Sequence, residues 1–162
     1  DPIEVRILPA NFAKAYQDYL VCTSKLLPVN YEQIKQTNVG FESGGYELDE
    51  KARKHLDVLL EYMAEDNSVN RIYLDGHSDN TGDRLLNRDV SRRRALAVKD
   101  YLMLKGGLNE DSFIVRFHGE RYPLKPNTND KNRSLNRRVN IRLDKIDPHF
   151  VAMQLEQEKS RE

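Results

Sequence analysis

The amino-acid sequence predicts an α/β (α+β) domain in which one mixed β-sheet carries its helices on one face. Three observations lead to this prediction. Short runs rich in branched and aromatic residues, which are typical of strands, are separated by two longer stretches with helical periodicity. Polar turns rich in glycine, asparagine and aspartate divide these runs. A long polar loop precedes the last strand, so the predicted order is β-α-β-α-β-β.

The first strand and the first helix are predicted between residues 37 and 68. Val39 and Phe41 mark a short strand. Asp49 can cap the helix, because its side chain can accept a hydrogen bond from a free N–H group of the first turn. The apolar residues of this helix recur at helical spacing and share one face. They are Ala52, Leu56, Leu59, Leu60 and Met63. Asp66-Asn67-Ser68 is expected to end the helix.

The remaining elements are predicted from the same kinds of pattern. They are a strand at Val69–Leu74, a loop at Asp75–Gly82, a helix from about Leu85 to Lys105, a strand at Phe113–Phe117, a long polar loop at Gly119–Leu135 and a strand at Arg138–Leu143. Gly106-Gly107 is a strong signal for the C-terminal end of the second helix. The last strand alternates strictly between polar and apolar residues, so it should be buried on one face only.

The sequence divides into three parts. Residues 37–143 form the main domain, and residues 144–162 form a charged C-terminal tail that is expected to be a solvated or fraying helix. Residues 1–36, with a weak strand pattern at Ile3–Leu8 and a helical pattern after it, are too few to bury their own apolar face. Because the chain begins at Asp1-Pro2 without a methionine, we expect residues 1–36 to be a linker or the tail of a truncated N-terminal domain.

Composition argues against several classes of protein. The 26 basic residues balance the 26 acidic ones, and this zero net charge argues against bulk binding of a polyanion. The arginines that could still mark a nucleic-acid face are Arg84, Arg88, Arg92, Arg93, Arg94, Arg133, Arg137, Arg138 and Arg142. Interspersed aspartates and few aromatic residues count against that reading, so we expect no nucleic acid partner. No run reaches the roughly 18 apolar residues of a spanning helix, so we expect no transmembrane segment in this chain.

The loop Asp75–Gly82 lies where a strand ends and a helix begins. Backbone N–H groups are free at such a position, and ligands commonly bind there. An ordinary polar turn has the same composition, because asparagine, aspartate, serine and glycine dominate turns. The loop alone therefore does not establish a binding site.

Arg94 is the more informative residue. It falls between Val90 and Val98 on the apolar stripe of the second helix, where a guanidinium group is costly unless it is paired. Asn87 and Ser91 share nearly the same side of the helix. One interpretation is an internal salt bridge from Arg94 to a loop carboxylate, Asp79 or Asp75, in a purely structural module.

The other interpretation is that Asp79 and Arg94 both face a ligand. Asp79 would accept hydrogen bonds from an ammonium group, and Arg94 would hold a carboxylate in a bidentate fork. Together they complement a zwitterion, such as a free amine and a free carboxylate on one stereocentre. Each charge-assisted hydrogen bond would contribute roughly 1.5–3 kcal/mol, which suits a repetitive polymer bound at several sites.

Two other interpretations of the same residues are a metal site and a hydrolase. His77, His118 and Asp79 could suggest a metal site, but the sequence lacks paired histidine or cysteine ligand spacings. A hydrolase built on Ser78 and His77 would place both groups side by side on one loop, with nothing to orient the base. We therefore expect no catalytic residues, no metal and no cofactor.

Several motifs of the chain, in order and spacing, resemble one known family. They are Gly76-His77-Ser78-Asp79-Asn80-Thr81-Gly82, Asn87, Ser91-Arg92-Arg93-Arg94-Ala95, His118-Gly119-Glu120-Arg121-Tyr122-Pro123 and Asn136-Arg137-Arg138-Val139. This pattern, which spans about Val39 to Leu143, is similar to the C-terminal domain family of the outer-membrane protein OmpA, which includes the lipoprotein Pal and flagellar stator proteins. The resemblance implies non-covalent binding of peptidoglycan through the diaminopimelate of its stem peptide.

The resemblance also implies which residues bind the ligand. They are Asp79, Asn80, Thr81, Asn87, Arg94 and Arg137. Asp79 and Arg94 match the two positions that grip the zwitterion, and Arg137 matches an arginine that closes the site. Ser78 departs from the more common threonine but keeps the hydroxyl group.

Within the family, the flagellar-motor members are the most similar. This likeness rests on Leu8–Phe12, Cys22, Leu26–Tyr31 and His118–Pro123. It implies a periplasmic, cell-wall-associated protein at the flagellar basal body near the outer membrane, with motor or envelope proteins as partners. Cys22 would then have a disulfide partner outside this chain. A general envelope tether of the OmpA or Pal type is the alternative.

Overall fold

The computed structural model describes residues 31–66, 69–146 and 148–161. The elements are β1 (Tyr31–Gly40), α2 (Glu50–Glu65), β2 (Val69–Gly76), α3 (Arg84–Gly106), a 3₁₀ turn (Glu110–Ser112), β3 (Phe113–Phe117), α4 (Asp130–Asn136), β4 (Arg138–Ile146) and α5 (Pro148–Ser160). The expectations for Ile3–Leu8, for the helix after it and for Cys22 lie outside the described residues. One compact unit spans Gln33–Lys145.

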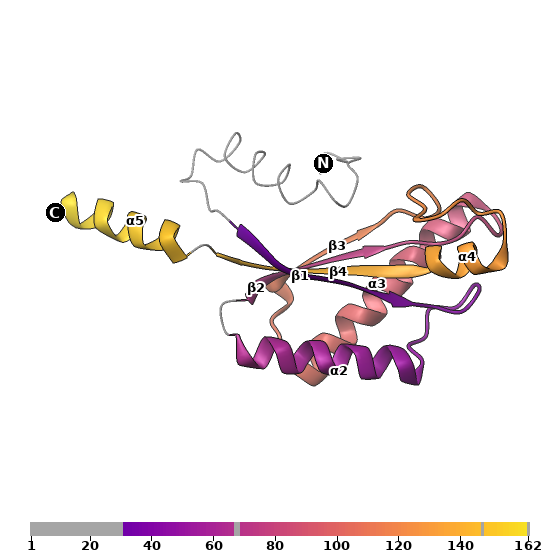
Figure 1. The fold of residues 1–162 in the computed structure, drawn as a ribbon, viewed down its shortest axis with the longest axis horizontal. Helices are drawn as coiled ribbons and strands as arrows, with labels where there is room; N and C mark the ends of the chain where they lie inside the picture. The colour runs from indigo at the N-terminus through magenta and orange to yellow at the C-terminus, as the bar shows by residue number, and fades with distance from the viewer. Residues whose placement is uncertain (1–30, 67–68, 147, 162) are drawn as a thin grey trace. The chain divides into compact units, whose positions relative to one another are not determined.

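The four strands form one mixed sheet in the order β1-β4-β2-β3. β3 is parallel to β2, with Leu74 opposite Val115, whereas β4 is antiparallel to β2, with Leu74 opposite Ile141. β2 and β4 are the two central strands (Figure 1). The C-terminal end of β2, where the loop Asp75–Gly82 begins, therefore lies in the middle of the sheet.

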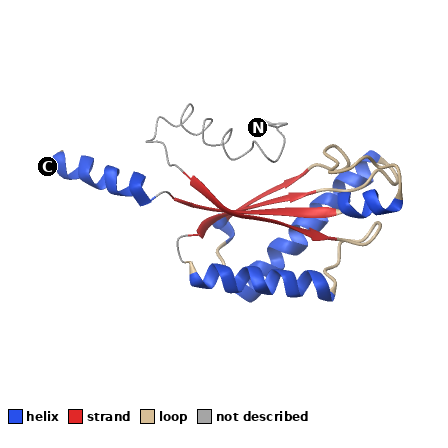
Figure 2. Ribbon diagram, viewed as in Figure 1, coloured by secondary structure: helices blue, strands red, loops and turns tan. Residues whose placement is uncertain are grey.

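Helices α2 and α3 cover one face of this sheet (Figure 2). The core between the helices and the sheet consists of Val39, Phe41, Ala52, Leu56, Leu59, Met63, Ile72, Leu74, Ala95, Val98, Leu102, Val139, Ile141 and Leu143. Alternate residues of β2 and β4 supply its sheet side, as the period of two in their sequences predicts. The predicted mixed sheet with helices on one face is confirmed.

The helix ends follow the predicted signals. The Asp49 side chain accepts a hydrogen bond of 2.7 Å from the backbone N–H of Ala52 at the start of α2. At the end of α3, Gly107 has a φ of 62° and donates its backbone N–H to the carbonyl of Met103. A left-handed residue at this position suits glycine, because glycine carries no Cβ. Across the described residues, no helix is both long and apolar enough to cross a membrane.

Two elements differ from the sequence-based expectation. β1 is a ten-residue strand rather than a short one at Val39–Phe41, and α4 lies within and just beyond the loop predicted at Gly119–Leu135. Both are polar, so hydrophobic periodicity does not reveal them. β1 is an edge strand held partly by side-chain amides, since Gln36 and Asn38 hydrogen-bond the side chain of Asn140.

The last strand, β4, is buried on both faces, so the expectation of a half-buried strand is wrong. The face opposite the helices carries charged side chains in place of apolar ones. Arg142 lies 3.3 Å from Asp144, and its guanidinium group stacks 3.9 Å from the centre of the Tyr73 ring. Pairing and stacking of this kind let charged residues be buried, which alternation of polar and apolar residues cannot predict.

Candidate functional site

The site is built where β2, α3 and the loop after β3 meet. A Cβ atom on Gly76 would lie 2.0 Å from the backbone oxygen of Ser91, so the absence of a side chain lets α3 pack directly on the end of β2. The Ser91 hydroxyl accepts a 2.9 Å hydrogen bond from the N–H of Gly119, whose carbonyl in turn accepts one of 2.9 Å from the N–H of Ser78. These contacts fix the start of the loop Asp75–Gly82.

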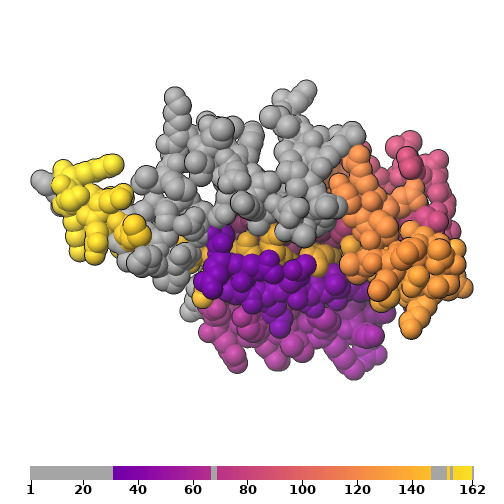
Figure 3. Space-filling model, turned by 45° about the horizontal axis from the view of Figure 1, so that its top comes forward, coloured from indigo at the N-terminus to yellow at the C-terminus, as the bar shows by residue number. Residues whose placement is uncertain are grey.

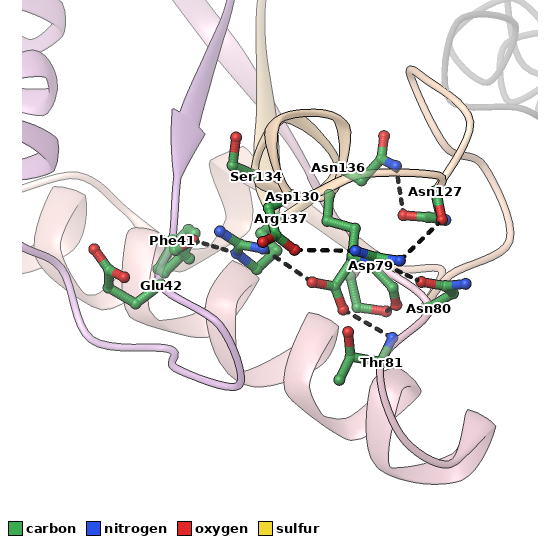
Figure 4. Close-up of polar contacts among 12 residues, drawn as sticks. Phe41, Glu42, Asp79, Asn80, Thr81, Asn127, Asp130, Ser134, Asn136 and Arg137 are labelled. Atoms are coloured by element: carbon green, nitrogen blue, oxygen red, sulfur yellow. Dashed lines mark hydrogen bonds and ion pairs between the residues drawn. The ribbon is translucent and has the colours of Figure 1, made fainter.

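Asp79 projects from this loop and is almost fully buried, with 4% of its surface exposed. One carboxylate oxygen accepts a 3.0 Å hydrogen bond from the N–H of Thr81, and the other lies 3.0 Å from Nη1 of Arg137 (Figure 4). Burial alone would raise the pKa of Asp79, but these hydrogen bonds outweigh it and hold the pKa below its usual value. The carboxylate is therefore ionised at neutral pH.

Arg137 is held in turn by the first strand. Its Nε donates a 2.9 Å hydrogen bond to the backbone oxygen of Phe41, just after β1. The backbone of the same residues is joined as well, since Phe41 N–H donates to the Arg137 carbonyl at 3.0 Å. One guanidinium group thus links the loop after β2 to the end of β1.

Arg94, on α3, has 1% of its surface exposed, as its place on the apolar stripe predicted. Its three nitrogens each donate to a backbone carbonyl. Nε donates to Gly45 at 2.7 Å, Nη1 to His77 at 2.9 Å and Nη2 to Glu42 at 3.0 Å. Burial lowers the pKa of Arg94 to about 10, which still leaves it charged at neutral pH, while the nearby negative charge of Asp79 acts in the opposite direction.

Among the described residues, Arg94 forms no salt bridge with Asp79 or Asp75, so the interpretation of an internal salt bridge is not supported. Asp79 pairs with Arg137, and Asp75 pairs with Arg116 at 2.7 Å and with His118 at 2.8 Å. Asp75 follows the strand alternation and projects on the face away from α3, opposite to Gly76. A guanidinium group carries five N–H donors, so Arg94 keeps one N–H on each Nη atom beyond those donated to the carbonyls.

The remaining predicted residues surround this pair. Asn80 and Thr81 are exposed on the loop, and Oδ1 of Asn80 accepts a 3.4 Å hydrogen bond from Nε of Arg133. Asn87 is 6% exposed, and its Oδ1 lies 3.9 Å from where a Cβ on Gly82 would be. Within the described residues, the side-chain nitrogen of Asn87 has no hydrogen-bond acceptor. The structure thus brings the six predicted residues to one end of the sheet.

Sequence reasoning missed the role of Asn136 and α4. The side chain of Asn136 accepts from the N–H groups of Leu124 and Lys125 and donates to the oxygens of Lys125 and Asn127, at 2.8 to 3.1 Å. It therefore fixes the loop between β3 and α4. In the space-filling view this orange segment lies beside the pink residues that follow β2 (Figure 3). The sequence signal that could have predicted α4 is the N-cap residue Asn129, whose side chain accepts a hydrogen bond from the N–H of Asn132.

His77 and His118, which suggested a metal site, stack on each other with ring centroids 5.0 Å apart. His77 is fully buried and neither ring nitrogen has a hydrogen-bond partner among the described residues. Burial, together with the charges of Arg138, His118 and Arg116, holds the pKa of His77 well below 6.5, so the ring is neutral. No group of three potential ligands that could hold a metal ion occurs in the part of the chain that the structure describes.

A four-stranded mixed sheet with two helices on one face, and a buried loop aspartate at the end of a central strand, defines an OmpA-like domain. The OmpA family model matches residues 40–137, and the chain belongs to this family.

Individual relatives agree with this assignment. The sodium-type flagellar protein MotY of Vibrio parahaemolyticus is 28% identical over 141 residues, which cover 87% of this chain and 48% of MotY. The peptidoglycan-associated lipoprotein of Pseudomonas putida is 32% identical over 106 residues, covering 65% of this chain and 62% of that protein. The chain thus spans about half of MotY and about three fifths of the lipoprotein.

Solved structures confirm the fold. The C-terminal domain of Helicobacter pylori MotB superposes with a TM-score of 0.61 at 19% identity, covering 77% of this chain and 96% of that domain. The predicted resemblance to the OmpA family, and to its flagellar-motor members, is confirmed.

Proposed function

We propose that this domain binds peptidoglycan non-covalently, through the diaminopimelate of the stem peptide, and so anchors an assembly of the cell envelope to the wall. The observation that carries the proposal is Asp79, an ionised carboxylate held at the end of β2 with the guanidinium groups of Arg94 and Arg137 around it. The name of the Pseudomonas putida relative, a peptidoglycan-associated lipoprotein, supports the choice of ligand.

The ligand would be bound by the hydrogen-bond donors of Arg94 and acceptors of Asp79 that are not used within the protein. Asp79 accepts hydrogen bonds from the ammonium group of the zwitterionic centre, because a carboxylate has acceptor positions beyond those used by Thr81 and Arg137. Arg94 receives the carboxylate through the N–H groups that it does not donate to backbone carbonyls. Asn80 and Thr81 contact the ligand from the exposed loop. Asn87 offers a side-chain nitrogen without an acceptor among the described residues, and Arg137 holds the Asp79 carboxylate.

The assembly that is anchored is proposed to be the flagellar motor, with the protein located in the periplasm near the basal body. The similarity to MotY extends over 141 residues and therefore beyond the matched range 40–137. A tether of the OmpA or Pal type is the alternative. Purified flagellar basal bodies probed with an antibody to this protein would distinguish them, since only the first predicts enrichment there.

Co-sedimentation with purified peptidoglycan sacculi tests the binding function. Wild-type protein should pellet with sacculi, and Asp79→Asn should bind at least tenfold more weakly. A hydrogen bond to a charged group contributes roughly 1.5–3 kcal/mol, and about 1.4 kcal/mol corresponds to a factor of ten in affinity. Asp100→Asn, the same change at an exposed position of α3, is the matched control and should pellet like the wild type. Equal pelleting of all three proteins would contradict the proposal.

The pH dependence of pelleting is a second test of binding through Asp79. The pKa of Asp79 lies below its usual value, so the carboxylate stays ionised as the pH falls from 7 to 5. Binding through Asp79 should therefore be constant over this range and decline only at pH values below the usual pKa of an aspartate, where the carboxylate becomes protonated. A decline centred near pH 6 would point to a histidine instead.

A further inference from the structure

Arg94, Arg133 and Arg137 are among the arginines whose guanidinium groups contact the loop that carries Asp79, and Arg94 and Arg137 are each held by several hydrogen bonds. Arg94 is buried and donates to the carbonyls of Glu42, Gly45 and His77. Arg137 has a side chain that is 15% exposed and holds Asp79. Moving either one would leave buried polar groups without partners, which is costly.

Arg133, on α4, is held much less tightly. Its Nε lies 3.4 Å from Oδ1 of Asn80 and its Nη2 lies 3.4 Å from the backbone oxygen of Asn127, both beyond the usual length of such hydrogen bonds. Its closest partner is Asp130 at 3.0 Å, whose side chain is fully exposed, while the Arg133 side chain itself is 31% exposed. Exposed ion pairs between neighbours on a helix contribute little, so this guanidinium group can exchange its partner for another anion.

Arg133 is also placed beside the proposed ligand. Its contact with Asn80 brings it to the residue that follows Asp79, and Figure 4 draws this contact together with the Asp79 site. When Oδ1 of Asn80 accepts from Arg133, the amide nitrogen of Asn80 remains as a further donor on the exposed loop. An anion bound there would be next to, and separate from, the zwitterionic centre at Asp79.

We propose that Arg133 and Asn80 form a second anion-binding position, which receives a second carboxylate of the stem peptide, one residue away from the diaminopimelate centre. This inference rests on the proposed function and specifies the class of ligand further. In a stem peptide in which glutamate is joined to diaminopimelate through its γ-carboxylate, the α-carboxylate of that glutamate is free, and we assign it to this position. A bidentate guanidinium contact suits a carboxylate and is lost when that group is a neutral carboxamide. The domain therefore discriminates unamidated from amidated stem peptides.

A purely structural role for Arg133, as a tie between α4 and the loop, makes a different prediction. Loosening that tie would weaken binding of any peptide that uses the loop. An anion-binding role affects only the peptide that carries the second carboxylate. Comparing two ligands on one set of variants separates the roles.

The experiment is a titration of the whole chain with two synthetic tripeptides, L-Ala-γ-D-Glu-diaminopimelate with the glutamate α-carboxylate free, and the same peptide with that group as a carboxamide. The wild type should bind the free form about tenfold more tightly, which corresponds to about 1.4 kcal/mol. Arg133→Gln should abolish this preference by weakening only the free form. Asp130→Asn, which removes the competing carboxylate, should tighten binding of the free form by about twofold to threefold.

Arg92→Gln is the matched control, because Arg92 forms a similar exposed pair with Asp89 three residues away, on α3. It should leave both affinities unchanged. Equal wild-type affinity for the two peptides, or an equal loss for both in Arg133→Gln, would overturn the inference while leaving the proposed function standing. Wild-type protein that binds neither peptide and does not pellet with sacculi would overturn both.

Discussion

Replacement of Gly76 with alanine is expected to lower the free energy of unfolding by about 3 kcal/mol, the upper end of what overpacking of a core usually costs. The new Cβ would lie 2.0 Å from the carbonyl oxygen and 2.8 Å from the carbonyl carbon of Ser91, both of which are backbone atoms. No side-chain rotation can relieve that clash, so α3 must move away from β2. Chemical denaturation with urea measures the change.

The matched control is Gly40→Ala, because a Cβ on Gly40 would meet only the carbonyl oxygen of Arg137, at an ordinary 3.9 Å. Its free energy of unfolding should stay within about 1 kcal/mol of the wild type, the usual scale of a glycine-to-alanine change that fits. The movement of α3 in Gly76→Ala would also displace Arg94 and Ser91 and so weaken the site. A Gly76→Ala protein as stable as Gly40→Ala would show that the close packing of α3 on β2 is not needed.

Replacement of Arg94 with alanine should lower the free energy of unfolding by roughly 3–5 kcal/mol, since hydrogen bonds to charged groups contribute roughly 1.5–3 kcal/mol each and are not additive. Three backbone carbonyls, those of Glu42, Gly45 and His77, lose their donor at once. The loop after β1 would then separate from the end of β2. Thermal and urea unfolding report the loss.

Two further variants test whether the contacts of Arg94 with the backbone carbonyls cause this loss of stability. Arg94→Lys keeps the positive charge but has one nitrogen in place of a planar fork, so it should recover only part of the stability. Arg93→Ala, at the neighbouring and partly exposed position, breaks a surface pair with Asp89 and should cost less than about 1 kcal/mol. If Arg94→Ala were no less stable than Arg93→Ala, the carbonyl contacts would not be what holds the loop.

The sequence predicted the burial of Arg94 because helical periodicity is a local property. Its partners were not predictable in the same way. The carbonyls of Glu42 and Gly45 belong to a polar turn that is far from Arg94 along the chain. The sequence does not indicate which backbone carbonyls accept hydrogen bonds from a side chain. The likeness to the OmpA family added Arg137 to Asp79 as a site residue, but it did not predict the ion pair between them.

The elements that were missed share one physical property. β1 and α4 present polar residues on most of their surface, so neither shows the apolar periodicity by which strands and helices are recognised. β1 is stabilised by its neighbour β4, and the loop before α4 is fixed by Asn136. Such tertiary contacts override local propensity, and they position Arg133 and Arg137 beside the loop that carries Asp79.

The loop Asp75–Gly82 is proposed to recognise one zwitterionic centre through its charges. Titration of the protein with meso-diaminopimelate, followed by nuclear magnetic resonance of the backbone amides, is a direct test of this recognition. Saturable shifts should centre on Asp79, Asn80 and Thr81. Pimelate without amines, cadaverine without carboxylates, and the Asp79→Asn protein should each bind at least about tenfold more weakly. Pimelate or cadaverine binding as tightly as diaminopimelate, or unchanged binding by Asp79→Asn, would contradict recognition of the zwitterion by this loop.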